Sequence, residues 1–165
     1  MLKPGPDFRV VQAAEPLLSY EPLILSGAQH MAGYWPQAAA LLQPVVDGAM
    51  HGEMTIDDIY QAVADGRMYC IVFKDDTAGE VPAVALALVL ELVAYPRKTM
   101  MGIVAVGGQE LGLFQSRFWK HICSWAYMNG VREMQAMVSP AMARVIGRYG
   151  FAQVYNVMRL PITEM

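Results

Sequence analysis

Alternating apolar and polar positions predict strands near the start of the chain and in its middle. Phe8 to Ala13 is a short candidate strand, and Met68 to Lys74 alternates and is rich in strand-forming residues. Pro82 to Ala94 is a nearly unbroken apolar run, which is typical of a central strand buried on both faces. Thr99 to Val106 is the next predicted strand. Because short turns join the last three segments, we expect them to form an antiparallel meander.

Helical periodicity is clearest after Thr55. This residue is a candidate N-cap, acidic residues occupy the first turn, and Gly66 is expected to stop the helix near Asp65. The preceding stretch, Glu15 to Met54, contains four prolines. Since proline interrupts helices, this stretch predicts two or three short helices.

The C-terminal third predicts a helix, a strand, a second helix and a last strand. The first helix follows Gly112 and closes at Asn129-Gly130. The remaining segments are a strand over Val131 to Val138, a helix over Pro140 to Tyr149 with Ser139 as its N-cap, and a final strand over Phe151 to Leu160. The predicted order is therefore β-α-α-β-β-β-α-β-α-β. It indicates an α/β fold of the α+β type, in which helices flank a mixed, mostly antiparallel central sheet.

Composition indicates one domain that presents an apolar surface. The chain has 165 residues, of which 55% are hydrophobic and 16% charged, and 13 are methionine. Soluble domains average about 25% charged residues, so we expect a homo-oligomer or a protein partner. Aromatic residues and methionine are enriched at interfaces, which favours Tyr34-Trp35-Pro36, Tyr155, Val157 and Met158 for this surface. The alternative is that the apolar N-terminal helices simply cover the sheet.

Several other classes of protein are disfavoured. A formal charge of −3 without basic runs argues against a nucleic-acid partner. The longest apolar run, Val81 to Ala94, is too short for a membrane span, since a spanning helix needs about 20 residues. The N-terminus resembles no signal peptide, and Cys70 and Cys123 are interpreted as buried reduced thiols, which predicts a cytoplasmic protein. The three histidines lack metal-ligand spacing, so no metal site is expected.

A glycine-rich turn after the Thr99 to Val106 strand is the most informative local feature. Gly107-Gly108-Gln109-Glu110-Leu111-Gly112 connects this strand to the N-terminus of a predicted helix. Free backbone N–H groups and the positive end of a helix dipole would meet there, which predicts a site for a phosphate or pyrophosphate. The alternative is a plain turn whose glycines supply unusual backbone angles.

This order of elements, with the glycine turn after the fourth strand, resembles the GNAT superfamily of acyl-CoA N-acyltransferases over nearly the whole chain. The segment from Ser139 to Phe151 resembles the family's helix ending in Gly-Phe before a last strand. The resemblance implies that acetyl-CoA binds with its pantetheine arm on the backbone of Val104 and Val106. It also implies that backbone N–H groups hold the pyrophosphate and that one further residue faces the co-substrate. These positions are Gln109, Leu111 and Gly112 for the pyrophosphate, and Ser139 for the facing residue.

The chemistry of the family implies a base for the amine and an acid for the departing thiolate. Glu91, an acidic residue within an apolar strand, is the candidate base, and its alternative role is that of a structural hydrogen-bond partner. The family commonly places a tyrosine on the penultimate helix, where this sequence has Ile146. Tyr149, three positions later, is the candidate acid.

Two functions follow from the resemblance. The first is an acetyl-CoA-dependent N-acyltransferase that acts on a primary amine. The second keeps the fold without the chemistry, as a structural or interaction subunit of a larger assembly such as a virus particle. Low charge, abundant methionine, Ile146 in place of tyrosine, and Phe114 where the family has glycine or alanine favour this second function.

Overall fold

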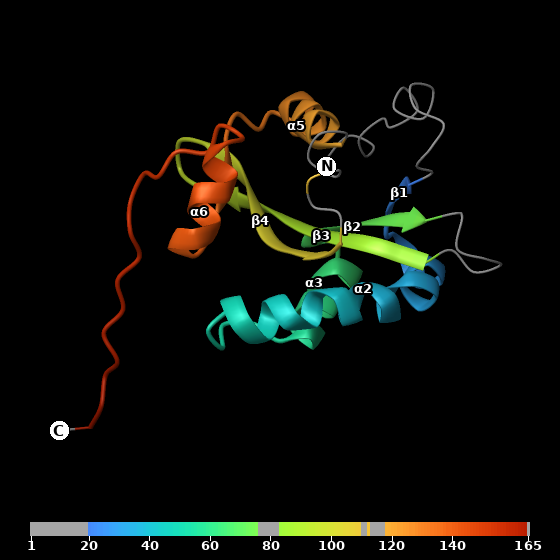
Figure 1. The fold of residues 1–165 in the computed structure, drawn as a ribbon, viewed down its shortest axis with the longest axis horizontal. Helices are drawn as coiled ribbons and strands as arrows, with labels where there is room; N and C mark the ends of the chain where they lie inside the picture. The colour runs from blue at the N-terminus through green and yellow to red at the C-terminus, as the bar shows by residue number, and fades with distance from the viewer. Residues whose placement is uncertain (1–19, 76–82, 110–111, 113–117, 165) are drawn as a thin grey trace.

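The computed structural model describes residues 20–75, 83–109, 112 and 118–164. Figure 1 shows a twisted sheet between two layers of helices. The elements, in chain order, are β1 (Tyr20–Ile24), α2 (Gly27–Ala49), α3 (Ile56–Ala64), β2 (Met68–Asp75), β3 (Ala83–Ala94), β4 (Thr99–Gly108), α5 (Trp119–Met128), β5 (Met134–Ala136) and α6 (Pro140–Gly147).

Within the described ranges the sheet has five strands in the order β1-β2-β3-β4-β5. The first three pairings are antiparallel, and β4 pairs with β5 in parallel. The predicted meander of β2, β3 and β4 and the predicted α+β class are therefore confirmed. The predicted first strand over Phe8 to Ala13 lies outside the described residues.

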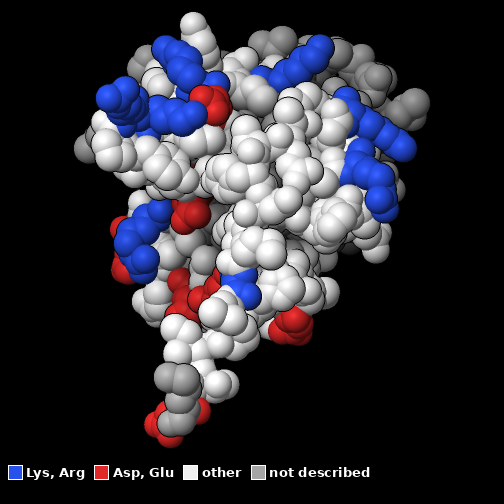
Figure 2. All heavy atoms as spheres, turned by 90° about the vertical axis from the view of Figure 1, so that its left-hand side faces the viewer, with Lys and Arg blue, Asp and Glu red and all other residues white. Residues whose placement is uncertain are grey.

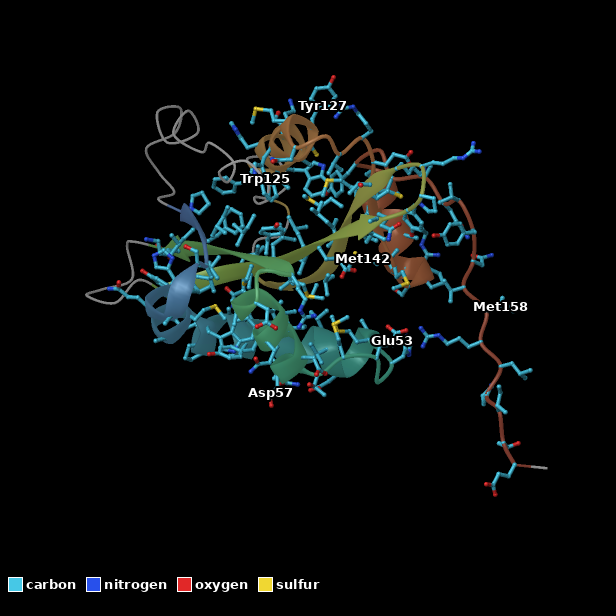
Figure 3. All side chains as sticks on the ribbon, turned by 180° about the vertical axis from the view of Figure 1, so that it is seen from behind. Glu53, Asp57, Trp125, Tyr127, Met142 and Met158 are labelled. Atoms are coloured by element: carbon cyan, nitrogen blue, oxygen red, sulfur yellow. The ribbon has the colours of Figure 1, made fainter. Side chains whose placement is uncertain are left out.

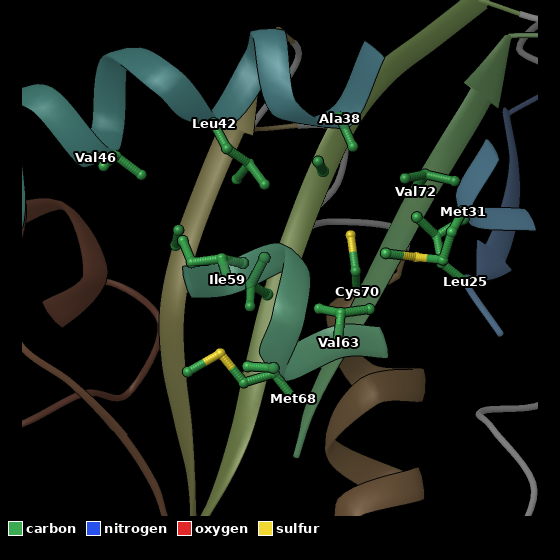
Figure 4. Packing of buried hydrophobic residues seen from close by; sticks show 14 of the residues in the cluster. Leu25, Met31, Ala38, Leu42, Val46, Ile59, Val63, Met68, Cys70 and Val72 are labelled. Carbon is green, nitrogen blue, oxygen red and sulfur yellow. The ribbon is translucent and has the colours of Figure 1, made fainter. Parts of the chain in front are cut away.

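Two apolar cores lie on opposite faces of the sheet. The first core packs α2 and α3 against one face, where Leu42, Ile59 and Cys70 are fully buried (Figure 4). The second core packs α5 against the other face around Trp125 and Leu88. Side chains of β3 alternate between the two cores, which explains the unbroken apolar run of this strand.

The prediction of two or three short N-terminal helices is wrong, because α2 is one helix of 23 residues. It contains Pro36 and Pro44, and both are exposed. A proline removes the hydrogen bond to the carbonyl four residues earlier, here at Ala32 and Ala40. Both of these alanines are also exposed, so water can solvate their carbonyls and the helix continues. The same stretch holds β1, whose Pro22 is tolerated because β1 lies at an edge of the sheet formed by the described strands.

The predicted helix after Thr55 is confirmed as α3. The Thr55 Oγ1 accepts a hydrogen bond from the Asp58 N–H, and the Asp58 carboxylate accepts one from the Thr55 N–H at 2.8 Å. The Asp58 carboxylate also accepts a hydrogen bond from the Thr55 hydroxyl at 2.7 Å, and the two bonds that it accepts, from the Thr55 N–H and the Thr55 hydroxyl, lower the pKa of Asp58. Gly66 follows the helix with φ +73°, as expected for a residue that ends it.

The predicted final strand over Phe151 to Leu160 is wrong. Residues 151–164 form an extended chain without regular secondary structure, and Figure 1 shows this segment leaving the body of the molecule. We call it the C-terminal tail. Its residues favour strand structure, but a strand forms only when another strand pairs with it, and no described strand pairs with the tail.

Candidate functional site

The candidate site lies where β4 and β5 part. The two strands pair from Met101 with Met134 to Ile103 with Ala136, and there β5 ends. β4 continues to Gly108. The β5-facing edge of β4 beyond Ile103 therefore carries backbone groups without a strand partner among the described residues, and an extended ligand can pair with such an edge.

A β-bulge marks the start of this open edge. Leu90 pairs with Ile103 and Val89 with Ala105, so Val104 is the extra residue. Further along, the Gln109 N–H donates to the Ala85 carbonyl of β3 at 3.0 Å. Because backbone amides point alternately to the two edges of a strand, the amide of Val106 points away from β3. This alternation does not carry across the bulge to Val104, since on the other side of the bulge the Met101 N–H points away from β3, toward the Glu133 carbonyl.

The side chains of these two valines pack into the cores. Val104 packs with the first core and Val106 with the second. What these residues present to the open edge is therefore backbone. This is the role that the resemblance implies for Val104 and Val106, and that role stays a prediction.

The two glycines at the end of β4 have packing reasons for their identity. A Cβ on Gly107 would lie 2.2 Å from the Leu41 carbonyl oxygen of α2. Gly108 has φ +128°, and a Cβ there would lie 2.3 Å from the Ala85 carbonyl oxygen. Neither position has room for a side chain, because backbone atoms of α2 and β3 lie too close. This supports the alternative in which Gly107 and Gly108 belong to a plain turn and do not mark a phosphate site.

The remaining predicted phosphate contacts divide into three cases. The backbone N–H of Gln109 is bonded to β3, so the expectation that it would hold a pyrophosphate needs correction, and only its exposed side chain faces outward. Leu111 lies outside the described residues. Gly112 is exposed, with open space around its α-carbon.

Ser139 is the N-cap of α6, as predicted. Its Oγ accepts a hydrogen bond from the Met142 N–H at 3.2 Å, and Pro140 follows at the first helical position. Ser139 is exposed, and no described contact tests its predicted role toward a co-substrate.

Glu91 lies beside the point where the strands part. It faces Gly102 across the β3–β4 ladder, and Gly102 in turn pairs with Gln135 of β5. A Cβ on Gly102 would lie 3.2 Å from the Glu91 Cγ and 3.4 Å from its Oε1, so the glycine leaves room for this side chain. Glu91 shares the first-core side of the sheet with Val104 and is half-buried. Within the described part of the chain its carboxylate makes no hydrogen bond or ion pair, which gives no support to a structural hydrogen-bond role.

Tyr149 lies beyond the end of α6, because the helix closes at Gly147 instead of at Tyr149 as predicted. Its N–H donates to the Ile146 carbonyl at 2.9 Å, and its side chain is exposed. Ile146, at the position where the family has tyrosine, is half-buried on α6. No described contact joins Tyr149 to Glu91.

The two thiols are poor nucleophiles at neutral pH. Burial raises the pKa of Cys70 to about 12, and burial also raises the pKa of the half-buried Cys123. Among the described residues no three metal-binding side chains come together. No helix in the described ranges is long and apolar enough to span a membrane.

The family resemblance implies an opening between the fourth and fifth strands, but sequence reasoning missed the bulge at Val104. One signal was available, since a glycine inside a strand pattern often marks a bulge or a close approach. Gly102 is such a residue. It lies two positions before the bulge and directly opposite Glu91.

Comparison with family models and with curated proteins finds no match to this sequence. Solved structures do match its fold. An acetyltransferase from Trypanosoma brucei is 14% identical with a TM-score of 0.61, and the match covers 87% of this chain and 100% of that one. The glucosamine-6-phosphate N-acetyltransferase from Arabidopsis thaliana is 12% identical with a TM-score of 0.62, over 88% of this chain and 99% of that one.

A third similar structure is an aminoglycoside acetyltransferase from an uncultured soil metagenomic sample, in complex with sisomicin. It is 13% identical with a TM-score of 0.57, and the match covers 90% of this chain and 97% of that one. At these identities the likeness concerns the fold. The element order, the sheet that opens between β4 and β5, and these matches together show that the chain has the GNAT acetyltransferase fold, in a divergent form.

Proposed function

We propose that the protein transfers an acyl group from an acyl-CoA, with acetyl-CoA as the first candidate, to a primary amine. The observation that carries this proposal is the open edge of β4 beyond Ile103, which begins beside Glu91 and along which the amide of Val106 points away from β3. A pantetheine arm has amide groups that can pair with such an edge as an added strand would. The thioester would supply an activated acyl group.

Glu91 would act as the base. It would take a proton from the ammonium form of the acceptor, directly or through one water, so that the free amine can attack the thioester carbonyl. The C–N bond forms as the C–S bond breaks, the attacking nitrogen gives its second proton to solvent, and the thiolate leaves with a proton that Tyr149 or solvent supplies. Holding the amine next to the thioester would provide much of the acceleration.

Charge on one side of the molecule supports an anionic ligand. Figure 2 shows Lys and Arg side chains along the upper rim of the side that carries α6 and the C-terminal tail, around an uncharged central area. Arg144 and Arg148 lie on α6 and in the turn after it, and within the described residues neither makes an ion pair. A phosphate-bearing ligand would gain from such a rim although the whole chain has a formal charge of −3.

A calorimetric titration with acetyl-CoA tests the proposal. We expect a dissociation constant in the micromolar range, about −8 kcal/mol. Replacing Val106 with Pro removes an amide of the open edge without removing a bond to β3, so we expect affinity to fall at least about tenfold. The matched variant Val106→Ala keeps the amide and should bind nearly as the native chain does. Absence of heat and of a thermal shift at millimolar acetyl-CoA would refute the proposal.

Release of free thiol in the presence of primary amines tests the reaction itself. The panel should include sisomicin and glucosamine 6-phosphate, because structures with this fold are described as acetyltransferases of aminoglycosides and of that sugar phosphate. The acceptor with the highest turnover then serves the experiments on individual residues.

The second candidate is a non-catalytic subunit of a larger assembly with the same fold. It is favoured by the Gln109 amide, which is bonded to β3, and by the packing that already accounts for Gly107 and Gly108. It predicts neither acetyl-CoA binding nor thiol release, so the two experiments above distinguish the candidates.

A further inference from the structure

Polar side chains from two strands and a turn surround one glycine of β4. Glu91 of β3 faces Gly102 across the ladder, and Gly102 pairs in turn with Gln135 of β5. Paired residues of neighbouring strands project from the same face of a sheet, so Glu91 and Gln135 flank a position without a side chain. Tyr95, in the turn after β3, donates a hydrogen bond from its hydroxyl to the Gln135 Oε1 at 3.3 Å. We call these four residues the Gly102 site.

The hydrogen bond from Tyr95 orients the side-chain amide of Gln135. Because the Oε1 atom accepts from the tyrosine, the amide nitrogen keeps its N–H groups for another acceptor, and within the described residues it has none. The Glu91 carboxylate likewise makes no hydrogen bond or ion pair in the described ranges. The Gly102 site therefore offers an unpaired anion and an unpaired donor on the same face of the sheet.

Two other carboxylates at this end of the molecule are already paired. Glu133, directly before β5, pairs with Lys98 at 2.7 Å. Glu53 in the α2–α3 connection pairs with Arg159 of the C-terminal tail, and Figure 3 shows Glu53 at the end of the molecule that carries α6 and this tail. Glu91 has no such cation beside it in the described part of the chain, so its carboxylate is available to an ammonium group of a ligand.

Strand spacing limits what can bind between Glu91 and Gln135. The Glu91 Oε1 would lie 3.4 Å from a Cβ on Gly102, so the carboxylate lies over the glycine. The next strand is about 4.8 Å away. Two hydrogen bonds of about 2.9 Å, one from each side, already exceed this gap. A ligand can therefore bridge the two side chains only with polar atoms that are close neighbours in its own structure.

We propose that the acceptor carries an oxygen atom on the carbon next to its amine-bearing carbon, and that Gln135 binds this oxygen while Glu91 binds the ammonium group. The side-chain amide donates to the oxygen, and the carboxylate accepts from the nitrogen. Tyr95 is a positioning residue, since it acts on the acceptor only through Gln135. The oxygen is the hydroxyl of an amino alcohol or the carbonyl of an amino amide. This inference rests on the proposed acyl transfer and adds the chemical class of its acceptor.

Three amines of similar size test this class by thiol release: propylamine without oxygen, isopropanolamine with the hydroxyl, and glycinamide with the carbonyl. For at least one oxygen-bearing amine we expect kcat/KM to exceed that of propylamine by about tenfold. Gln135→Leu should remove this advantage through the KM for the amine and leave kcat/KM for propylamine unchanged. Because the ratio between amines is compared in the native chain and the variant, differences in their intrinsic reactivity cancel. The preferred oxygen distinguishes the amino alcohol from the amino amide.

Removal of one hydroxyl tests the positioning role of Tyr95. Tyr95→Phe should reduce the advantage of the oxygen-bearing amine about threefold without changing acetyl-CoA affinity, because a less restrained amide binds the oxygen less well. Tyr127→Phe is the matched control. Tyr127 is exposed on α5, across the sheet from the Gly102 site, and its hydroxyl makes no hydrogen bond within the described residues. This control should keep the native ratio between the amines.

Binding of the amines without acetyl-CoA separates this inference from the transfer reaction. In saturation-transfer NMR, the preferred oxygen-bearing amine should give a signal that weakens in Gln135→Leu and in Glu91→Gln. Such binding without thiol release would refute the transfer and keep the site. Thiol release with equal preference for all three amines, or a ratio that Gln135→Leu leaves unchanged, would overturn the inference and keep the transfer. Neither binding nor release would overturn both.

Discussion

Replacing Glu91 with Gln is expected to lower amine acetylation by roughly 10²- to 10⁴-fold while acetyl-CoA affinity and folding stay unchanged. Glutamine keeps the size of the side chain but cannot accept the proton of an ammonium group. Folding should tolerate the change, because Glu91 makes no hydrogen bond or ion pair in the described part of the chain and Gly102 leaves room beside it. Steady-state thiol release with the best acceptor of the amine panel measures the effect.

Glu133→Gln is the matched control for this substitution. Glu133 precedes β5 and pairs with Lys98 at 2.7 Å on the exposed surface. Exposed ion pairs contribute little to stability, so this variant should retain native turnover. Equal turnover in the Glu91 and Glu133 variants would remove Glu91 from the mechanism, and gross unfolding of the Glu91 variant would assign it a structural role.

Replacing Gly107 with Ala is expected to destabilise the protein by about 3 kcal/mol, the upper end of the usual cost of overpacking, because the new side chain would meet backbone atoms. The added Cβ would lie 2.2 Å from the oxygen and 2.7 Å from the carbon of the Leu41 carbonyl. Both atoms are backbone atoms of α2, so relief requires the helix to move off the sheet. Urea denaturation followed by circular dichroism measures the loss.

Gly33→Ala separates this packing effect from the general effect of replacing a glycine. Gly33 lies inside α2, is exposed, and has no atom within 4 Å of an added Cβ. Alanine favours helix by about 1 kcal/mol over glycine, so this variant should be slightly more stable than the native chain. Similar stability of the Gly33 and Gly107 variants would show that α2 and β4 do not pack as closely as described.

Local signals in the sequence were sufficient for much of the fold. The capping residue Thr55 and the stop at Gly66 placed α3, and the apolar run up to Ala94 placed the central strand β3. Ser139 and Pro140 placed the start of α6. Each of these signals acts within a few residues, which is why pattern alone could identify them.

Features that depend on distant partners could not be predicted. Whether Pro36 and Pro44 break a helix depends on which side of it meets solvent, and that is decided by packing on the sheet. Whether the tail forms a strand depends on what lies beside it, and its residues carry the same pattern paired or unpaired. Gly107 packs against the backbone of Leu41, which lies 66 positions earlier in the sequence. The glycine motif therefore suggested a ligand site, although the close packing of α2 explains why glycine stands at this position.

Glu91 was chosen as the candidate base because the sequence predicted that it is buried, and this is only partly true of the structure. Its isolation in an apolar strand predicted burial, yet the residue is half-buried near the end of β3. Its position beside the parting of β4 and β5 came from strand register, which is not encoded near Glu91 itself. The bulge at Val104 has the same origin, because it arises from how two strands align.

The absence of buried residues in α6 has a thermodynamic consequence for whatever binds beside it. A helix of eight residues without a buried face is marginal in water, because packing supplies most of the stability of short helices. A ligand or strand that contacts α6 therefore has to order it, and that entropy is subtracted from the free energy of association. Affinity on this side of the sheet would then be governed by coupled folding, with a heat-capacity change larger than the contact area alone accounts for.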